Sequence, residues 1–227
     1  SDKELRVVNQ EVRSASLEIV YFTCNTHPPE ISEMCRQQLL KSNLPIVSVS
    51  LNKEIDFGDV RIVHKGTRGI GTMLEQIWIG LKATQANSVF LCESDVLYHP
   101  SHFLFNPPDN SVFYYNTNVW KWHWPEQRYV WTDDLQQVSG VVANRELLLD
   151  FYYKKIRQYE IEGNDRHYEP GLKQKIGGQK VENWQSEYPN ICIRHTNNLT
   201  RTKKNKDDFV NKQYAKGWTE STSVSGW

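Results

Sequence analysis

Hydrophobic positions in the first hundred residues alternate between two spacings. Apolar runs rich in β-branched and aromatic residues predict strands at 17–24, 44–51, 59–66 and 88–96. Between these runs, apolar residues recur every three or four positions, which predicts helices at 31–40 and 71–84. Strands that alternate with helices are typical of a mainly parallel sheet with helices on both faces. We therefore predict an α/β fold.

The second half of the chain is patterned less regularly. A strong helix is predicted at 145–160, and strands are expected at 112–116, at 139–144 and within 182–200. The residues from 201 to 227 form a polar tail, and neither an internal repeat nor a low-complexity linker divides the chain. Residues 1–227 are therefore predicted to form a single domain.

Charge and composition argue against several classes of protein. The 227 residues carry 27 Lys and Arg against 27 Asp and Glu, which excludes nucleic-acid binding by overall charge alone. No apolar run approaches the length of a membrane span, and the polar N-terminus does not resemble a signal peptide. The four cysteines lack C-x-x-C spacing and are expected to be reduced. These features favour a cytoplasmic protein.

Two acidic residues end the fourth predicted strand. Glu93 and Asp95 flank Ser94, and residues two apart on a strand point to the same side. Two neighbouring carboxylates need a cation or hydrogen-bond donors, and Mg²⁺ and Mn²⁺ prefer such oxygen ligands. Parallel sheets bind their ligands at the carboxyl ends of the strands, where this pair lies. The alternative is an ordinary strand end with exposed acids.

The order of these elements, together with the segment after the acidic pair, resembles the GT-A glycosyltransferases, most nearly the family 2-like members. In that family a strand ends in D-x-D or a variant such as E-x-D, followed by an aromatic residue, Pro and Phe. Here Tyr98, Pro100 and Phe103 match that segment. The resemblance covers residues 17–103 well and residues 139–195 more loosely.

This resemblance implies a GT-A (Rossmann-like) fold and a nucleoside-diphosphate sugar as donor, with a UDP-sugar expected. It implies that Glu93 and Ser94 contact the donor and that Asp95 ligates Mn²⁺ or Mg²⁺. Many GT-A enzymes add a late histidine to the same metal, and His195 ends a late apolar run; the alternative is a polar strand-end residue. The two predicted halves are a nucleotide-sugar-binding half at 17–103 and an acceptor half at 104–200.

Further donor contacts are expected after the first strands. The resemblance places Thr23 and Asn25 where the nucleoside base binds, and Asn52 stands near the point where the family usually has an Asp. Arg68 lies in a Gly-rich segment before a helix, and a helix N-terminus with an Arg suits a diphosphate. The alternative for Arg68 is a plain loop with a solvated side chain.

The catalytic base is predicted from spacing. In the family an acidic pair follows a glycine-led segment by about thirty residues, and counting from Gly140 leads to Glu169. The usual Glu-Asp is here Glu169 followed by Pro170, so Asp133 and Asp134 remain competitors. A base opposite the leaving group implies inversion at the anomeric carbon, but the sequence leaves inversion and retention open.

A Trp-rich segment is the candidate acceptor platform. Trp120, Trp122 and Trp124 alternate as on one side of an extended segment, and indoles stack on sugar faces and on bases. The alternative is that these residues belong to the core. A rival metal site is a zinc cluster of His99, His102 and His123.

Three functions remain open on the sequence alone. A metal-dependent glycosyltransferase with a saccharide acceptor is favoured. The second is a phage-type glycosyltransferase that acts on a hydroxymethylated pyrimidine base of DNA in the host cytoplasm, and the third is a non-catalytic carbohydrate-binding module. DNA phosphates would suit a late basic stretch, although Asp207 and Asp208 balance it. This stretch consists of Arg194, Arg201, Lys203, Lys204 and Lys206.

Overall fold

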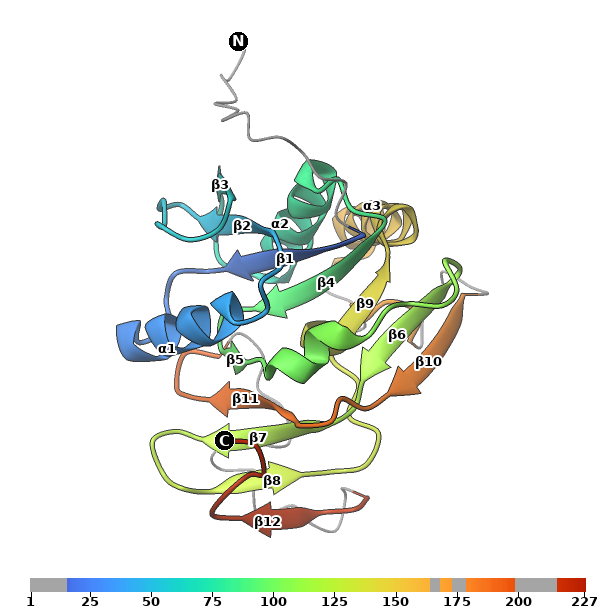
Figure 1. Ribbon diagram of the computed structural model, residues 1–227. Coiled ribbons are helices and arrows are strands. Elements are labelled where there is room, and N and C mark those ends of the chain that lie inside the picture. Colours follow the sequence, from blue (N-terminus) through green and yellow to red (C-terminus); the bar gives the residue numbers. More distant parts are fainter. Residues whose placement is uncertain (1–15, 164–167, 173–178, 199–215) are drawn as a thin grey trace.

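The chain folds into two β-sheets that lie one above the other in the view of Figure 1, with helices packed on the larger sheet. The computed structural model describes residues 16–163, 168–172, 179–198 and 216–227. Within these residues, no helix combines the length and the apolar character needed to cross a membrane.

Parallel strands form one half of the larger sheet. They are β1 (Leu17–Thr23), β2 (Ile46–Leu51), β3 (Val60–His64) and β4 (Ser88–Glu93). β1 pairs with β2 and with β4, and β2 pairs with β3, all in parallel. Because strands on both sides and helices on both faces cover β1, all but its first residue are buried.

Three further strands complete this seven-stranded sheet. They are β6 (Val112–Asn116), β9 (Val141–Asn144) and β10 (Lys180–Trp184), and the strand order is β10-β6-β9-β4-β1-β2-β3. β9 runs antiparallel to β4 and β6, whereas β6 and β10 pair in parallel. The predicted α/β fold with a mainly parallel sheet is therefore confirmed.

Helices cover both faces of the larger sheet, as predicted. The elements are α1 (Pro29–Leu40), α2 (Ile70–Ala83), α3 (Arg145–Glu162) and the short 3-10 helices η1 (Pro100–Leu104) and η2 (Val138–Gly140). Leu74 of α2 and Phe151 of α3 share one core with Val20 of β1. Leu39 of α1 and Phe103 of η1 belong to a second core on the opposite face.

The second sheet has five strands in the order β12-β8-β7-β11-β5. Its strands are β5 (Val96–Leu97), β7 (Val119–His123), β8 (Tyr129–Trp131), β11 (Asn190–Arg194) and β12 (Thr219–Ser221). The sequence pattern predicted only the late strand of this sheet. The Trp-rich segment forms the β7–β8 hairpin. β7 also pairs in parallel with β11, which lies about seventy residues later in the sequence.

The strand predicted at 88–96 is divided into two. β4 ends at Glu93, the chain turns at Ser94 and Asp95, and β5 enters the second sheet. The Asp95 carbonyl accepts a hydrogen bond of 2.8 Å from the Ile193 backbone N–H, which joins the turn to β11. Glu93 therefore ends β4 and Asp95 lies in the turn between the sheets, so the two acids do not lie along one extended strand.

α2 crosses β1 and β2 closely at Gly80. A Cβ atom there would lie 2.6 Å from Val20 Cγ1 and 3.2 Å from Val49 Cγ2. Both valines are fully buried, so they cannot move without opening the core. We expect Gly80→Ala to lower the free energy of unfolding by about 1–3 kcal/mol, measured by urea unfolding. Gly69→Ala, with open space around its Cβ, is the control; equal losses in both variants would contradict this account.

Candidate active site

A cavity of about 300 Å³ opens where the carboxyl ends of β1, β2 and β4 meet the second sheet. Phe22, Leu51 and Glu93 line it from the larger sheet, and Lys121 and Arg194 line it from the smaller one. Parallel sheets bind their ligands at this edge, because strand ends and the following loops converge there. The cavity is therefore the candidate active site.

The pKa values of Glu93 and Asp95 are shifted in opposite directions. Burial and the neighbouring Asp95 raise the pKa of Glu93 to about 7, against the lowering effect of Lys121 and Arg194. Burial also acts to raise the pKa of Asp95, but the contact with His195 and the positive charges of His27, His195 and Arg194 hold it well below its usual value. Asp95 is thus the permanent anion of the pair.

His195 lies beside Asp95, although 100 residues separate them in the sequence. His195 Nε2 is 3.5 Å from Asp95 Oδ2, longer than a normal hydrogen bond. Two atoms that bind one ion at about 2.1 Å lie roughly 3.0–3.5 Å apart. The spacing between this nitrogen and this oxygen therefore suits two ligands of the same metal ion.

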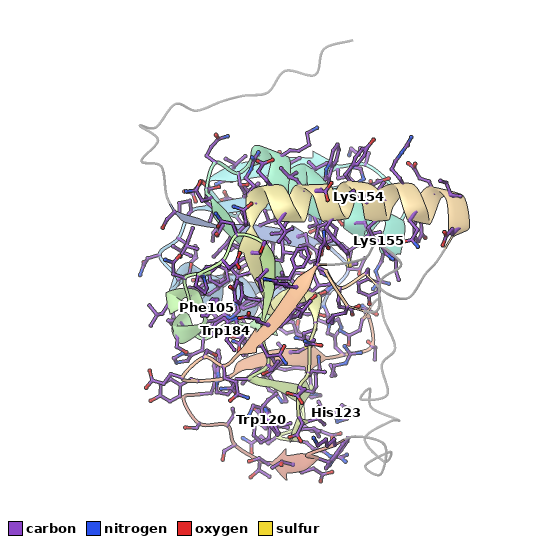
Figure 2. All side chains as sticks on the ribbon, turned by 90° about the vertical axis from the view of Figure 1, so that its right-hand side faces the viewer. Phe105, Trp120, His123, Lys154, Lys155 and Trp184 are labelled. Atoms are coloured by element: carbon purple, nitrogen blue, oxygen red, sulfur yellow. The ribbon has the colours of Figure 1, made fainter. Side chains whose placement is uncertain are left out.

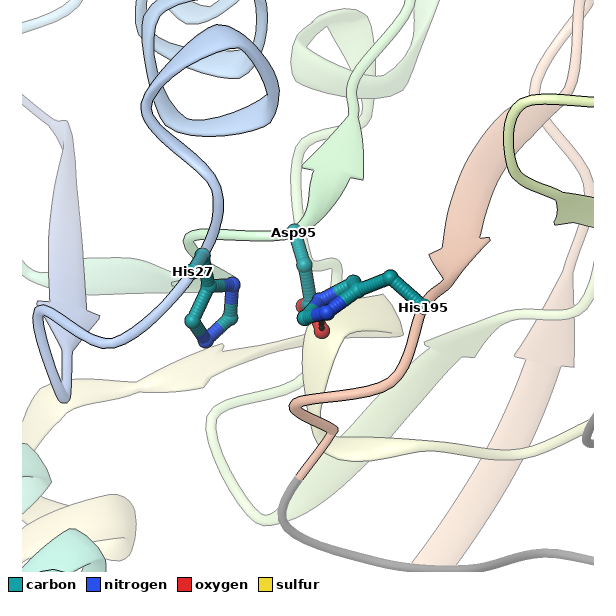
Figure 3. Close-up of side chains that lie close together, drawn as sticks. All are labelled: His27, Asp95 and His195. Atoms are coloured by element: carbon teal, nitrogen blue, oxygen red, sulfur yellow. Dashed lines mark ion pairs between the residues drawn. The ribbon is translucent and has the colours of Figure 1, made fainter.

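A third possible ligand comes from the loop between β1 and α1. The ligand atoms of His27, Asp95 and His195 all lie within 4.8 Å of one another, and Figure 3 shows the three side chains converging. In the described part of the chain, His27 Nδ1 and His195 Nε2 are buried without a hydrogen-bond partner. Buried nitrogens without partners are expected where a metal ion would complete them. The sequence analysis did not select His27, although it lies next to predicted donor contacts.

Two asparagines hold the loops around this cluster. Asn198 Nδ2 donates to Asp95 Oδ2 at 2.7 Å, and its Oδ1 accepts from the His195 backbone N–H at 2.7 Å. Asn197 Nδ2 donates to the Thr26 carbonyl at 2.9 Å, and the Asn197 carbonyl accepts from Arg68. The loop after β11 is thereby joined to the acidic turn, to the β1–α1 loop and to the start of α2.

Arg68 and the N-terminus of α2 line the cavity beside this cluster. Gly69 precedes α2, and no side chain caps the first turn of that helix. Uncapped backbone N–H groups at a helix N-terminus attract phosphate. Arg68 Nε is buried without a hydrogen-bond partner among the described residues. The structure therefore places the predicted diphosphate contact in the cavity.

Cys24 lies on the same side of the cavity. Burial raises the pKa of its thiol, but polar contacts with His27, Thr26 and Arg68 and the positive charge of His27 outweigh burial and lower the pKa to about 6. The predicted reduced state of the four cysteines agrees with the structure, where all of them are free thiols.

Three predicted donor contacts lie outside the cavity lining. Asn25 Nδ2 donates to the Leu51 carbonyl at 2.8 Å, and Asn52 Nδ2 donates to the Gly66 carbonyl at 2.8 Å. Both asparagines have left-handed backbone, with φ of 58° and 60°, which Asn tolerates better than most residues. Thr23 Oγ1 accepts from the Asn25 N–H. Thr23, Asn25 and Asn52 thus make hydrogen bonds that stabilise the local chain, and they do not line the cavity.

Of the candidate bases, Glu169 lines the cavity, together with Tyr168. Asp133 and Asp134 do not line it, whereas Gln136 and Gln137, which follow them, do. Asp133 instead packs against Gly217, and its backbone N–H donates to the Lys216 carbonyl at 3.0 Å.

Successive side chains of β7 point to opposite sides of the strand, and its tryptophans lie on the side away from the cavity. Lys121 is buried, lines the cavity and donates to Gln137 Oε1. Trp120 and Trp122 point to the opposite side of the strand and, with Trp124, pack partly buried against the core that contains Ile193. The predicted acceptor platform therefore does not face the cavity; a lysine missed in the sequence does.

The rival zinc cluster does not assemble in the described residues. His102 is fully buried and stacks on Trp184. Trp184 stacks in turn on Phe105, with ring centroids 4.3 Å apart, and Figure 2 shows these two residues next to each other. Burial lowers the pKa of His102 to about 3. His123 lies on the second sheet, where its Nδ1 pairs with Glu126 at 2.9 Å.

Of the predicted basic stretch, Arg194 lines the cavity, and residues 201–206 lie outside the described residues.

Comparisons with known proteins found structural likenesses only. No protein-family model and no curated protein matches the chain. HddC from Yersinia pseudotuberculosis covers 86% of this chain and 96% of its own, with 9% identity and a TM-score of 0.47. The match to the inositol-1-phosphate CTP transferase from T. maritima covers 79% of this chain and 90% of that protein, with 10% identity and a TM-score of 0.43. The match to a nucleotidyl transferase from Methanothermobacter covers 61% of this chain and 76% of that protein, with 10% identity and a TM-score of 0.42.

Proposed function

We propose that the protein is a metal-dependent glycosyltransferase that moves a sugar from a nucleoside-diphosphate sugar to a hydroxyl group. The observation that carries the proposal is the meeting of Asp95 and His195 beside Glu93 at the carboxyl edge of a parallel sheet. The same cavity contains Arg68 for phosphates and Glu169 for proton transfer. These are the parts that transfer of a glycosyl group from a diphosphate requires.

On the donor side, Arg68 and the N-terminus of α2 bind the diphosphate through charge and backbone N–H groups. Glu93 accepts hydrogen bonds from donor hydroxyls, and the buried Lys121 and Arg194 balance its charge. Asp95 and His195 hold the divalent ion. When bound there, Mn²⁺ or Mg²⁺ supplies positive charge that stabilises the departing diphosphate.

On the acceptor side, Glu169 takes the proton from the attacking hydroxyl group. Gln136 and Gln137 lie in the same lining and offer neutral hydrogen-bonding groups, which suit the hydroxyls of a saccharide. A saccharide therefore remains the favoured acceptor. A modified DNA base remains the alternative, and strongly salt-dependent binding to DNA would favour it.

We expect one or a few nucleotide sugars to release nucleoside diphosphate when incubated with the protein and Mn²⁺. The measurement is release of nucleoside diphosphate from a panel of UDP-, GDP- and TDP-sugars, with and without chelator. Release that stops in chelator supports the proposal and identifies the donor. If sugars bind but no nucleotide is released from any donor, the protein is a binding module and the proposed function is wrong.

A further inference from the structure

We propose that His27 is a third protein ligand of the metal and that the site therefore prefers transition-metal ions such as Co²⁺ and Zn²⁺, and also Mn²⁺, over Mg²⁺. This inference rests on the proposed function only for the placement of the metal in the donor cavity. Metal preference itself is a property of His27, Asp95 and His195.

The chemistry of the donor set favours transition-metal ions. Two of the three converging groups are imidazoles, and one is a carboxylate. Imidazole suits transition-metal ions, whereas Mg²⁺ takes an octahedral shell of oxygen atoms and few nitrogen ligands. A site with Asp95 as its single carboxylate is therefore a poor one for Mg²⁺. Three protein ligands also leave positions open for diphosphate oxygens, as in catalytic rather than structural sites.

The His27 and His195 rings present buried nitrogens toward each other and toward the Asp95 carboxylate. The ring centroids of His27 and His195 are 4.7 Å apart, and their planes are inclined at 55°, so they do not stack face to face. His27 Nδ1 and His195 Nε2 have no hydrogen-bond partner among the described residues, as stated above. Figure 3 shows both rings directed at Asp95. Packing alone would leave these two buried nitrogens without hydrogen bonds, which destabilises the folded state.

His27 is held in place by its neighbours in the sequence. Pro28 and Pro29 follow it at the start of α1 and restrict the backbone there. The preceding residue, Thr26, accepts a hydrogen bond from Asn197, two residues after His195. The loops that carry the two imidazoles are therefore joined to each other, which limits the ordering cost of metal binding.

Metal binding requires that one hydrogen bond of His195 is broken. The Asn197 backbone N–H lies 3.2 Å from His195 Nδ1. A neutral imidazole that binds a metal through Nε2 carries its proton on Nδ1, so it can no longer accept this hydrogen bond. The contact is long and joins residues two apart in one turn, so its loss is a small perturbation beside a new metal–nitrogen bond.

The test is calorimetric titration of chelator-stripped protein with Co²⁺, Zn²⁺, Mn²⁺ and Mg²⁺ chlorides, without any nucleotide. We expect Co²⁺ and Zn²⁺ to bind at least about tenfold more tightly than Mg²⁺. His27→Ala should weaken Co²⁺ binding by about 10–100-fold or more and change the visible absorption of the bound Co²⁺. His64→Ala is the matched control, because His64 pairs with Glu75 outside the cluster and should leave Co²⁺ affinity unchanged.

Equal affinity for Mg²⁺ and Co²⁺ in the wild-type protein would overturn the inference without any variant. Unchanged Co²⁺ affinity and absorption in His27→Ala would also overturn it. If His27→Ala melts at a lower temperature than the wild type in chelator, His27→Gln keeps the polar contacts and replaces it in the titration. Tight Co²⁺ binding through His27 with no turnover of any nucleotide sugar would contradict the proposed function and leave this inference standing.

Discussion

Asp95→Asn abolishes metal-dependent turnover and leaves the fold intact: this is the largest effect that we expect. Asn has the shape of Asp but lacks its negative charge, and the surrounding imidazoles keep Asp95 ionised by holding its pKa low. Loss of the metal's positive charge removes several kcal/mol of transition-state stabilisation, a fall of roughly 10³–10⁵-fold in turnover. The amide oxygen still accepts the hydrogen bond from Asn198, so unfolding is little affected.

The measurement is release of nucleoside diphosphate at saturating Mn²⁺, with thermal melting as the check on folding. Asp150→Asn is the control, since Asp150 lies on α3, pairs with Lys154 at 2.7 Å and does not line the cavity. Full activity of the wild type in chelator, with near wild-type activity of Asp95→Asn, would show that the reaction needs no metal at this site.

Glu169→Gln is expected to have the second largest effect, through the chemical step and not through donor binding. A positioned general base contributes about 10²–10⁴-fold, so kcat should fall by that factor while KM for the donor changes little. Glu169 lines the same cavity as Asp95 and Glu93. Its carboxyl group also contributes to the raised pKa values of the buried Tyr115 and Tyr152, after burial itself.

The competing bases provide the matched controls. Asp133→Asn and Asp134→Asn should retain near wild-type kcat, because neither residue lines the cavity. Steady-state kinetics at a fixed acceptor concentration separates kcat from KM in all three variants. A loss of kcat in Asp133→Asn or Asp134→Asn, with Glu169→Gln unaffected, would assign the proton transfer to the other acids.

Apart from β10, whose sequence KVENW gave no strand signal, the elements of the larger sheet were predictable because their signals are local. Each strand of the first half is a short apolar run, and the helix predicted at 71–84 is observed at Ile70–Ala83. The five-stranded sheet was not predictable in this way. β5 and β12 have two and three residues, and pairing with distant partners, not their own sequence, makes them strands.

The residues of the candidate site also divide into those that local sequence predicted and those that only the structure revealed. The acidic triplet, Arg68 and Glu169 were selected from the sequence, and the structure places all of them in the cavity lining. His27 was missed because a single histidine in a Pro-rich loop carries no signal until His195 lies beside it. Asn198 was missed for a similar reason, since its role is to bind two other residues of the site.

The sequence by itself determined which residues share a side of each strand; only the tertiary structure decided which side faces the cavity. In β7, alternation separates Trp120 and Trp122 from Lys121, and the sequence analysis assigned the functional side to the indoles. Pairing of β7 with β11 in one register turns Lys121 and Arg194 toward the cavity and the tryptophans toward a core. The physical reason is that a period of two specifies two faces but not their surroundings, which depend on contacts between residues far apart in the chain.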